Sequence, residues 1–241
     1  MEWIDHLLIV IFGFALPLRS LLTTSKGELL KMKFTAQNKF ILYYSNSLVL
    51  WFMATAVTFV WFSFGRELGE LGLQWGDIPF SPAAWLTLLA FILLYGLDSM
   101  LEIISPERQA ATRQKFQQQI GFLPASAFEF THFVFLAVTA GICEEIVFRG
   151  YFIRYGEWWF SELEAPLATI LVLVLPAVSF GLAHLYQGWW AVAKIVAMAI
   201  LFGFFFLETG TLWPLILVHI VVDLIGGLVS WYLLSGAGPN R

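Results

Sequence analysis

The sequence predicts an all-α protein that folds as a polytopic transmembrane bundle of about seven helices. Hydrophobic residues make up 59% of the 241 residues and charged residues only 12%, whereas charged residues are about a quarter of a typical soluble domain. The mean hydropathy is +0.79, and long apolar runs alternate with short polar segments along the chain. We therefore expect a multi-pass integral protein whose surroundings are a lipid bilayer.

Two further features of the composition exclude other classes of protein. Cys143 is the single cysteine, which excludes a disulfide framework and a cysteine-based metal cluster. The chain has 13 Lys and Arg against 17 Asp and Glu, without a basic patch of the size that nucleic-acid binding needs. We therefore expect no nucleic-acid partner.

Three apolar segments are expected to span the membrane in the first part of the chain, over residues 3–18, 40–64 and 83–104. Pro17 is expected to end the first of them. The polar loop between the first two holds five of the basic residues, namely Arg19, Lys26, Lys31, Lys33 and Lys39. Short loops rich in Lys and Arg stay in the cytoplasm, so the loop is predicted inside and the N-terminus outside.

The third span ends in a polar turn and leads into a second polar loop, residues 105–127. Asp98 and Glu102 share one face of the span, and we interpret them as groups that reach the interface or cap a neighbouring helix. A role in gating or in supporting a site is the alternative. The loop is again expected inside, with a short interfacial helix over residues 107–119.

Four more spans are expected in the second part of the chain. The fourth opens at Phe128, and helical character continues to Phe160, so this helix is expected to overshoot the membrane. The others cover residues 167–186, 189–207 and 212–234, with Lys194 expected to reach the inner interface. We divide the chain into N-terminal spans and cytoplasmic loops, residues 1–127, and a helical core, residues 128–241, that carries the candidate site.

The fourth span contains two adjacent carboxylates and an arginine within an apolar run. Glu145 and Arg149 are four residues apart, so on a helix they share a face and are expected to pair. Glu144 points about 100° away from Glu145 and is free to face another group. Charges inside a membrane span are costly, so they usually face the protein interior and serve a function there.

The fifth and seventh spans also carry polar residues within apolar runs, His184 in the fifth and His219 in the seventh. Glu144 and His184 are equally far from residue 164, the midpoint of the turn between their helices, so they are expected at equal depth. His219 lies about 8 residues after the next turn, roughly 12 Å into its helix. We expect a tilted or broken sixth helix, for example at Gly188, to bring His219 to the depth of the other two.

These residue types form the parts of a hydrolytic site. A Glu beside a His in a low-dielectric cavity can hold and deprotonate water, and a second His or an amide can donate to an oxyanion. No Ser lies in a nucleophile-elbow context. Zinc bound by two His and one Glu is an alternative use of the same groups. His6 and His132 are interpreted as residues that hydrogen-bond between helices.

At these residues the chain resembles the CPBP family, the CAAX protease and bacteriocin-processing group that includes type II CAAX prenyl endopeptidases. Three family motifs are present in order, E-E-x-x-x-R, F-x-x-x-H and H-x-x-x-N/D. In this chain they are Glu144-Glu145 with Arg149, Phe180 with His184, and His219 with Asp223. The resemblance covers roughly residues 128–235, and the first three spans carry no motif.

The resemblance implies a role for each motif residue. Glu144 would activate water with His184 as its partner, His219 and Asp223 would form the oxyanion site, and Glu145, Arg149 and Phe180 would support the helices. Prenyl endopeptidases usually have Asn where this chain has Asp223. An ionised Asp cannot donate to an oxyanion, so Asp223 is expected either to be protonated or to orient His219.

We therefore expect a glutamate-dependent intramembrane endopeptidase that needs no cofactor and cleaves a peptide or protein at the membrane. A non-catalytic binding, immunity or scaffold protein of the same fold is one alternative, a zinc-dependent intramembrane protease is another, and a proton-coupled transporter ranks last. The small loops favour the inner membrane of a bacterium. The sequence leaves open the substrate, its prenylation and the oligomeric state.

Overall fold

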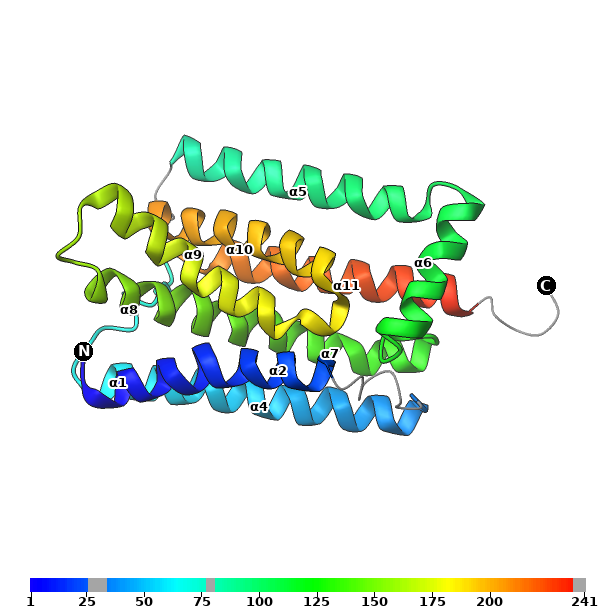
Figure 1. Ribbon diagram of the computed structural model, residues 1–241, viewed down its shortest axis with the longest axis horizontal. Coiled ribbons are helices and arrows are strands. Elements are labelled where there is room, and N and C mark those ends of the chain that lie inside the picture. Colours follow the sequence, from blue (N-terminus) through cyan, green and yellow to red (C-terminus); the bar gives the residue numbers. More distant parts are fainter. Residues whose placement is uncertain (26–33, 77–80, 236–241) are drawn as a thin grey trace.

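The computed structural model describes residues 1–25, 34–76 and 81–235, and all regular elements within these ranges are helices (Figure 1). Seven of the described helices are long and apolar enough to cross a membrane. This confirms the predicted all-α, multi-pass bundle. These spans are Trp3–Thr24, Ala36–Ser63, Pro82–Ile103, Ala127–Trp159, Ala165–Ala183, Trp189–Thr209 and Trp213–Ser235.

Two of the spans are composite helices that contain a π-helical segment. The first consists of α1 (Trp3–Leu8), η1 (Ile9–Ala15) and α2 (Leu16–Ser25). The fourth consists of α7 (Ala127–Glu144), η2 (Glu145–Tyr151) and α8 (Phe152–Trp159), so the predicted continuation of helical structure almost to Phe160 is confirmed. The remaining helices are α4 (Ala36–Ser63), α5 (Pro82–Ile103), α6 (Pro106–Gln119), α9 (Ala165–Ala183), α10 (Trp189–Thr209) and α11 (Trp213–Ser235).

The prediction that Pro17 ends the first helix is wrong, because the helix continues to Ser25. A proline has no N–H to donate to the carbonyl four residues earlier, which here belongs to Gly13. The hydroxyl of Ser179 in α9 donates to that carbonyl oxygen over 2.8 Å. A neighbouring helix thus satisfies the freed backbone group, which is the condition for proline inside a membrane helix.

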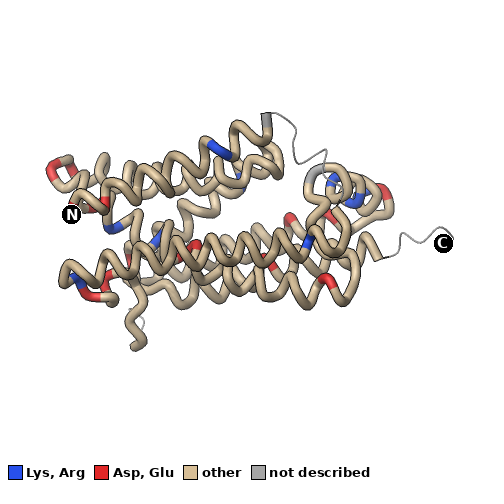
Figure 2. The backbone as a smooth tube through the Cα atoms, turned by 90° about the horizontal axis from the view of Figure 1, so that it is seen from below, with Lys and Arg blue, Asp and Glu red and all other residues tan. Residues whose placement is uncertain are grey.

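Helix α6 crosses one end of the bundle at a steep angle to the long helices (Figure 1). Ser105 caps it, since its Oγ accepts the Arg108 N–H over 3.3 Å. Phe116 is buried against Leu233 near the end of α11, and Arg113 Nε donates to the Leu233 carbonyl over 2.6 Å. The helix predicted over residues 107–119 is confirmed. Figure 2 shows most charged residues gathered at the two ends of the bundle and a few between them.

Histidine and lysine side chains link the spans. His6 Nδ1 lies 2.8 Å from the Tyr155 hydroxyl, and His132 Nδ1 lies 2.7 Å from the Tyr44 hydroxyl, as expected of hydrogen bonds between helices. Lys39, expected in the first polar loop, is buried within α4, where its Nζ lies 2.8 Å from Glu129 Oε2. A buried ammonium needs such a partner.

The α8–α9 hairpin has the predicted symmetry. Gly156 packs on Val172, with 3.3 Å between a Cβ built on the glycine and Val172 Cγ2. The rings of Phe148 and Phe180 are 5.0 Å apart. Residue 164 is the midpoint of both pairs, so positions 144 and 184 lie at the same depth in the two helices.

The predicted break in the sixth helix is wrong, since α10 runs unbroken from Trp189 to Thr209 and Gly188 precedes it. The depth of His219 instead follows from where α11 begins. The N–H of Leu212 donates to the Gly72 carbonyl over 3.1 Å, and a Cβ on Gly150 would lie 3.4 Å from Leu212 Cδ1. Helix α11 therefore begins level with Gly150 near the end of η2, so His219 lies level with the carboxylates.

Gly141 allows α7 and α11 to approach closely just before the carboxylates. A Cβ at this position would lie 2.5 Å from Ile220 Cγ1 and 3.1 Å from the Ile220 backbone nitrogen. Gly141→Ala should therefore destabilise the protein by about 1–3 kcal/mol through overpacking, measured by thermal unfolding in detergent. Gly96→Ala is the matched control because its Cβ meets nothing within 4 Å. Equal unfolding temperatures for the two variants would contradict this account of the packing.

Candidate active site

The π-helix η2 begins directly after Glu144 and includes Glu145 and Arg149. All its residues are buried. π-Helical turns are rare and occur frequently at functional sites, yet nothing in the local sequence pattern indicated one here. The predicted ion pair is present, with 3.2 Å between Arg149 Nη1 and Glu145 Oε1.

Glu145 is fully buried, and its carboxylate interacts with side chains of two helices, its own and α11. Its Oε1 lies 3.2 Å from Arg149 Nη1 and 2.7 Å from Nδ1 of His219 in α11. The guanidinium of Arg149 lies over the ring of Phe180 in α9, 4.5 Å from its centre, and 5.5 Å from the ring centre of Phe202 in α10. This carboxylate thus links the π-helix to the next three spans.

The hydrogen bond from Glu145 fixes the orientation of His219. An ionised carboxylate only accepts hydrogen bonds, so His219 Nδ1 carries the proton in this contact. The other ring nitrogen, Nε2, then faces Glu144 Oε2 at 3.7 Å and Asp223 Oδ2 at 3.9 Å. Glu145 rather than Asp223 therefore makes the hydrogen bond that orients His219.

His184 is oriented by the backbone of its own helix. Its Nδ1 lies 2.8 Å from the Phe180 carbonyl oxygen, and since a carbonyl only accepts, Nδ1 carries the hydrogen. In the neutral ring Nε2 is then an acceptor. The His184 ring packs on Phe180, with 4.6 Å between ring centres, and on Tyr186, at 5.9 Å.

The ring of Phe180 lies near both histidines of the site. Its ring centre lies 4.6 Å from that of His184 and 6.3 Å from that of His219. The structure therefore brings all the predicted site residues into one connected group. Within it, the close contact of Glu144 is with His219, while His184 lies at the predicted depth and packs on Phe180.

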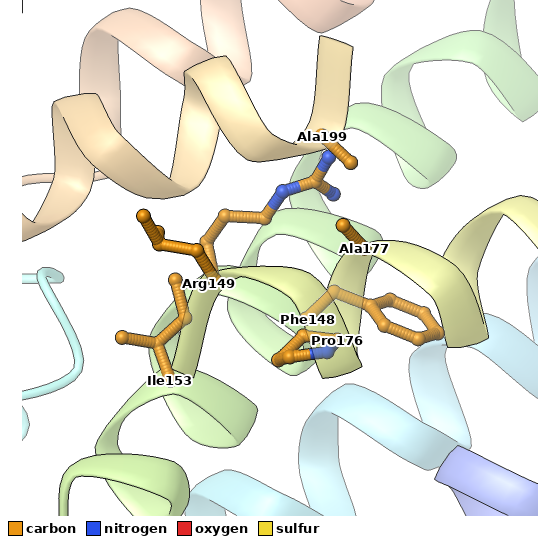
Figure 3. A pocket seen from close by; sticks show the side chains of 7 residues that line it. Phe148, Arg149, Ile153, Pro176, Ala177 and Ala199 are labelled. Carbon is orange, nitrogen blue, oxygen red and sulfur yellow. The ribbon is translucent and has the colours of Figure 1, made fainter. Parts of the chain in front are cut away.

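A cavity lies behind this group, beside the Arg149 guanidinium (Figure 3). Its wall is mainly apolar and comes from η2, α8, α9 and α10. The lining residues are Phe148, Arg149, Ile153, Leu173, Pro176, Ala177 and Ala199. Neither carboxylate nor histidine of the site is among them, so the cavity adjoins the supporting ion pair rather than the reacting groups.

Comparison with known proteins bears on the same part of the chain. Residues 126–225 match the family model described as type II CAAX prenyl endopeptidase Rce1-like. We refer to residues 126–225 as the Rce1-like domain, after the family model that they match. No curated protein and no solved structure is significantly similar to the chain.

The match confirms the recognised family, and the matched range contains all three motifs. Together with the seven apolar helices, the match to a CAAX-type protease family supports an integral multi-pass membrane protein.

Among the contacts between the N-terminal spans and the Rce1-like domain, two lie directly beside site residues, and sequence reasoning missed both. Ser20 Oγ donates to the Ala183 carbonyl over 3.1 Å, immediately before His184. The Tyr95 hydroxyl donates to the Val222 carbonyl over 2.9 Å, immediately before Asp223. Each partner is a backbone carbonyl, which leaves no sequence signature, so only a lone hydroxyl in an apolar span could have indicated these bonds.

Arg149→Met should test how far the site depends on the buried ion pair. The substitution leaves Glu145 buried without its cation, and we expect a loss of about 3–5 kcal/mol in the free energy of unfolding. The double variant Arg149→Met/Glu145→Gln removes both charges and keeps an acceptor for His219, so it should recover much of that loss. Thermal unfolding in detergent measures both, and a double variant no more stable than the single one would contradict this role.

Proposed function

We propose that this protein is an intramembrane endopeptidase in which Glu144, with His184 as its partner, activates water to hydrolyse a peptide bond. The observation that carries the proposal is the 2.7 Å hydrogen bond between His219 Nδ1 and Glu145. It leaves His219 Nε2 as a fixed polar atom beside Glu144, within an Rce1-like domain. A base and an oriented imidazole side by side are the parts needed for acyl hydrolysis.

The attacking water would be held between Glu144 and His184. The Glu144 carboxylate accepts one water hydrogen and acts as the base, while His184 Nε2 accepts the other. The His184 ring can play this part because its Nδ1 is committed to the Phe180 carbonyl. The Glu144 side chain is only 13% exposed, so the surrounding protein shields it from most bulk water.

His219 would stabilise the oxyanion through Nε2–H. This role requires a hydrogen on both ring nitrogens, which the carboxylates of Glu144, Glu145 and Asp223 surround within 3.9 Å. Asp223 then balances the charge of His219 and need not donate to the oxyanion. This assignment accounts for Asp at the position where prenyl endopeptidases usually carry Asn.

Glu144 takes up one proton during the reaction and gives it back at the end. Water forms the new C–O bond as Glu144 takes its proton, and the carbonyl electrons move to the oxygen beside His219. When the tetrahedral intermediate collapses, the C–N bond breaks and Glu144 returns the proton to the leaving amine. The products are a carboxylic acid and an amine, and Glu144 is again a carboxylate.

This route does not pass through a metal. Within residues 1–25, 34–76 and 81–235, no group of three or more His, Cys, Asp and Glu side chains is arranged to hold a metal ion. Zinc bound by Glu144, His184 and His219 is therefore tested directly, by a chelator arm in the cleavage assay. The predicted orientation, with the N-terminus outside and the C-terminus inside the inner membrane of a bacterium, belongs to the same proposal.

Glu144→Ala should abolish cleavage without unfolding the protein. General-base catalysis contributes about 10²–10⁴-fold, and we expect at least that loss in kcat for the purified protein in detergent. The peptide panel contains farnesylated and unmodified C-terminal CaaX peptides, each assayed with and without a zinc chelator. Glu162→Ala, in an exposed turn, is the matched control and should cleave normally.

Each arm of this assay has a distinct meaning. Cleavage by Glu144→Ala at the wild-type rate would overturn the proposed base. Cleavage that the chelator abolishes and zinc restores would overturn the metal-free route and assign Glu144, His184 and His219 to a metal site.

A further inference from the structure

The half of α5 nearest α6 has two chemically different faces. Tyr95, Asp98 and Glu102 are three and four residues apart, a spacing that places them on one face of a helix; we call them the α5 polar stripe. Leu97 and Leu101 face elsewhere and are 56% and 45% exposed. Their exposure is typical of side chains that contact lipid, whereas the stripe requires polar surroundings.

Each member of the α5 polar stripe contacts a different neighbouring helix. Tyr95 donates to the Val222 carbonyl in α11, and Asp98 Oδ1 lies 2.6 Å from Lys194 Nζ in α10. Glu102 Oε1 lies 3.8 Å from Lys115 Nζ in α6. The stripe thus runs from the backbone beside Asp223 to the end of the bundle that α6 crosses. Lys194, which is expected to reach the inner interface, is paired with Asp98.

Exposure increases along these polar groups from the site outward. The side chain of Glu145 is fully buried and that of His219 is 12% exposed. Asp223 is 32% exposed, while Lys194 and Asp98 reach 36% and 44%. Exposure thus rises from the buried site to the Asp98–Lys194 pair, and Glu102 and Lys115 beyond it are still 30% and 40% exposed, so partly exposed polar groups lead away from the site.

These exposed charged side chains cannot face the hydrocarbon of the lipid. Charged groups inside membrane spans face a protein interior or a water-filled cavity, and protein leaves a third or more of Asp98 and Lys194 uncovered. The other half of α5 is closed by apolar packing, since Leu88 and Phe91 are buried and the Phe91 and Phe202 ring centres are 4.7 Å apart. The partly exposed polar groups therefore lie on the side of α5 toward α6.

We propose that the α5 polar stripe, with Lys194 and Asp223 opposite it, lines a water-filled entrance through which water and the substrate peptide reach Glu144. The water part depends on the structure alone, and the peptide part rests on the proposed function. The Asp98–Lys194 pair lies at the side of this entrance and holds α5 to α10.

Thiol labelling in lipid vesicles tests the entrance. Asp98→Cys and Glu102→Cys are compared with Leu97→Cys and Leu101→Cys, each of which is a neighbour on the same helix at nearly the same depth. A charged methanethiosulfonate reagent reacts with the thiolate, which forms in water. We expect labelling at positions 98 and 102 at least about 10-fold faster than at 97 and 101, because the thiolate does not form where the side chain faces lipid.

The unmodified protein supplies the background, because its single cysteine, Cys143, is fully buried. Because Asp98→Cys leaves Lys194 unpaired, Lys194→Cys serves as a second test from the α10 side of the pair. It should also label rapidly. Thermal unfolding identifies any variant that fails to fold, and the folded ones decide the result. Equal labelling rates for stripe and lipid-facing positions would overturn the entrance.

A second measurement separates the peptide from the water. A CaaX peptide with a reduced scissile bond, farnesylated or unmodified, should slow labelling at position 98 and leave position 97 unchanged. Fast labelling that neither peptide slows would overturn the peptide part of the inference. Labelling does not require catalysis, so full cleavage by Glu144→Ala would overturn the proposed function and leave the labelling result intact.

Discussion

The buried carboxylate of Glu145 is the group on which the rest of this structure depends. It pairs with Arg149 in its own π-helix and accepts a hydrogen bond from His219 in α11. Arg149 in turn packs on aromatic rings of α9 and α10. A buried charge is strongly unfavourable without such partners, so the helices that supply them are held in one arrangement. Glu144 and His219 are neighbours as a consequence.

Close approach of the helices makes these short contacts possible. A Cβ on Gly141, Gly150 or Gly181 would lie within 2.8 Å of an atom in a neighbouring segment. Small residues at helix contacts are the usual means of bringing backbones together where lipid provides no hydrophobic drive. The fourth span continues beyond the carboxylates into α8, and α11 begins level with Gly150. Together these two features place His219 and the carboxylates at one depth.

The N-terminal spans have a different relation to the site from the Rce1-like domain. They carry no motif, yet Ser20 and Tyr95 bind the carbonyls that immediately precede His184 and Asp223. The third span, α5, has the smallest buried share of the seven, and its polar half is attached through side-chain pairs. The spans therefore support the site from outside, and one of them borders the side on which polar groups become exposed.

The sequence by itself determined the class of fold, the seven spans, the Glu145–Arg149 pair and the common depth of Glu144 and His184. Each follows from local information, namely hydropathy, helical spacing and distance from a turn. The partner of His219, the π-helix, the continuation through Pro17 and the pairing of Lys194 with Asp98 were decided only by the tertiary structure. They depend on which groups of distant segments meet, such as Ser179 with the freed Gly13 carbonyl, and such meetings have no periodicity in the chain.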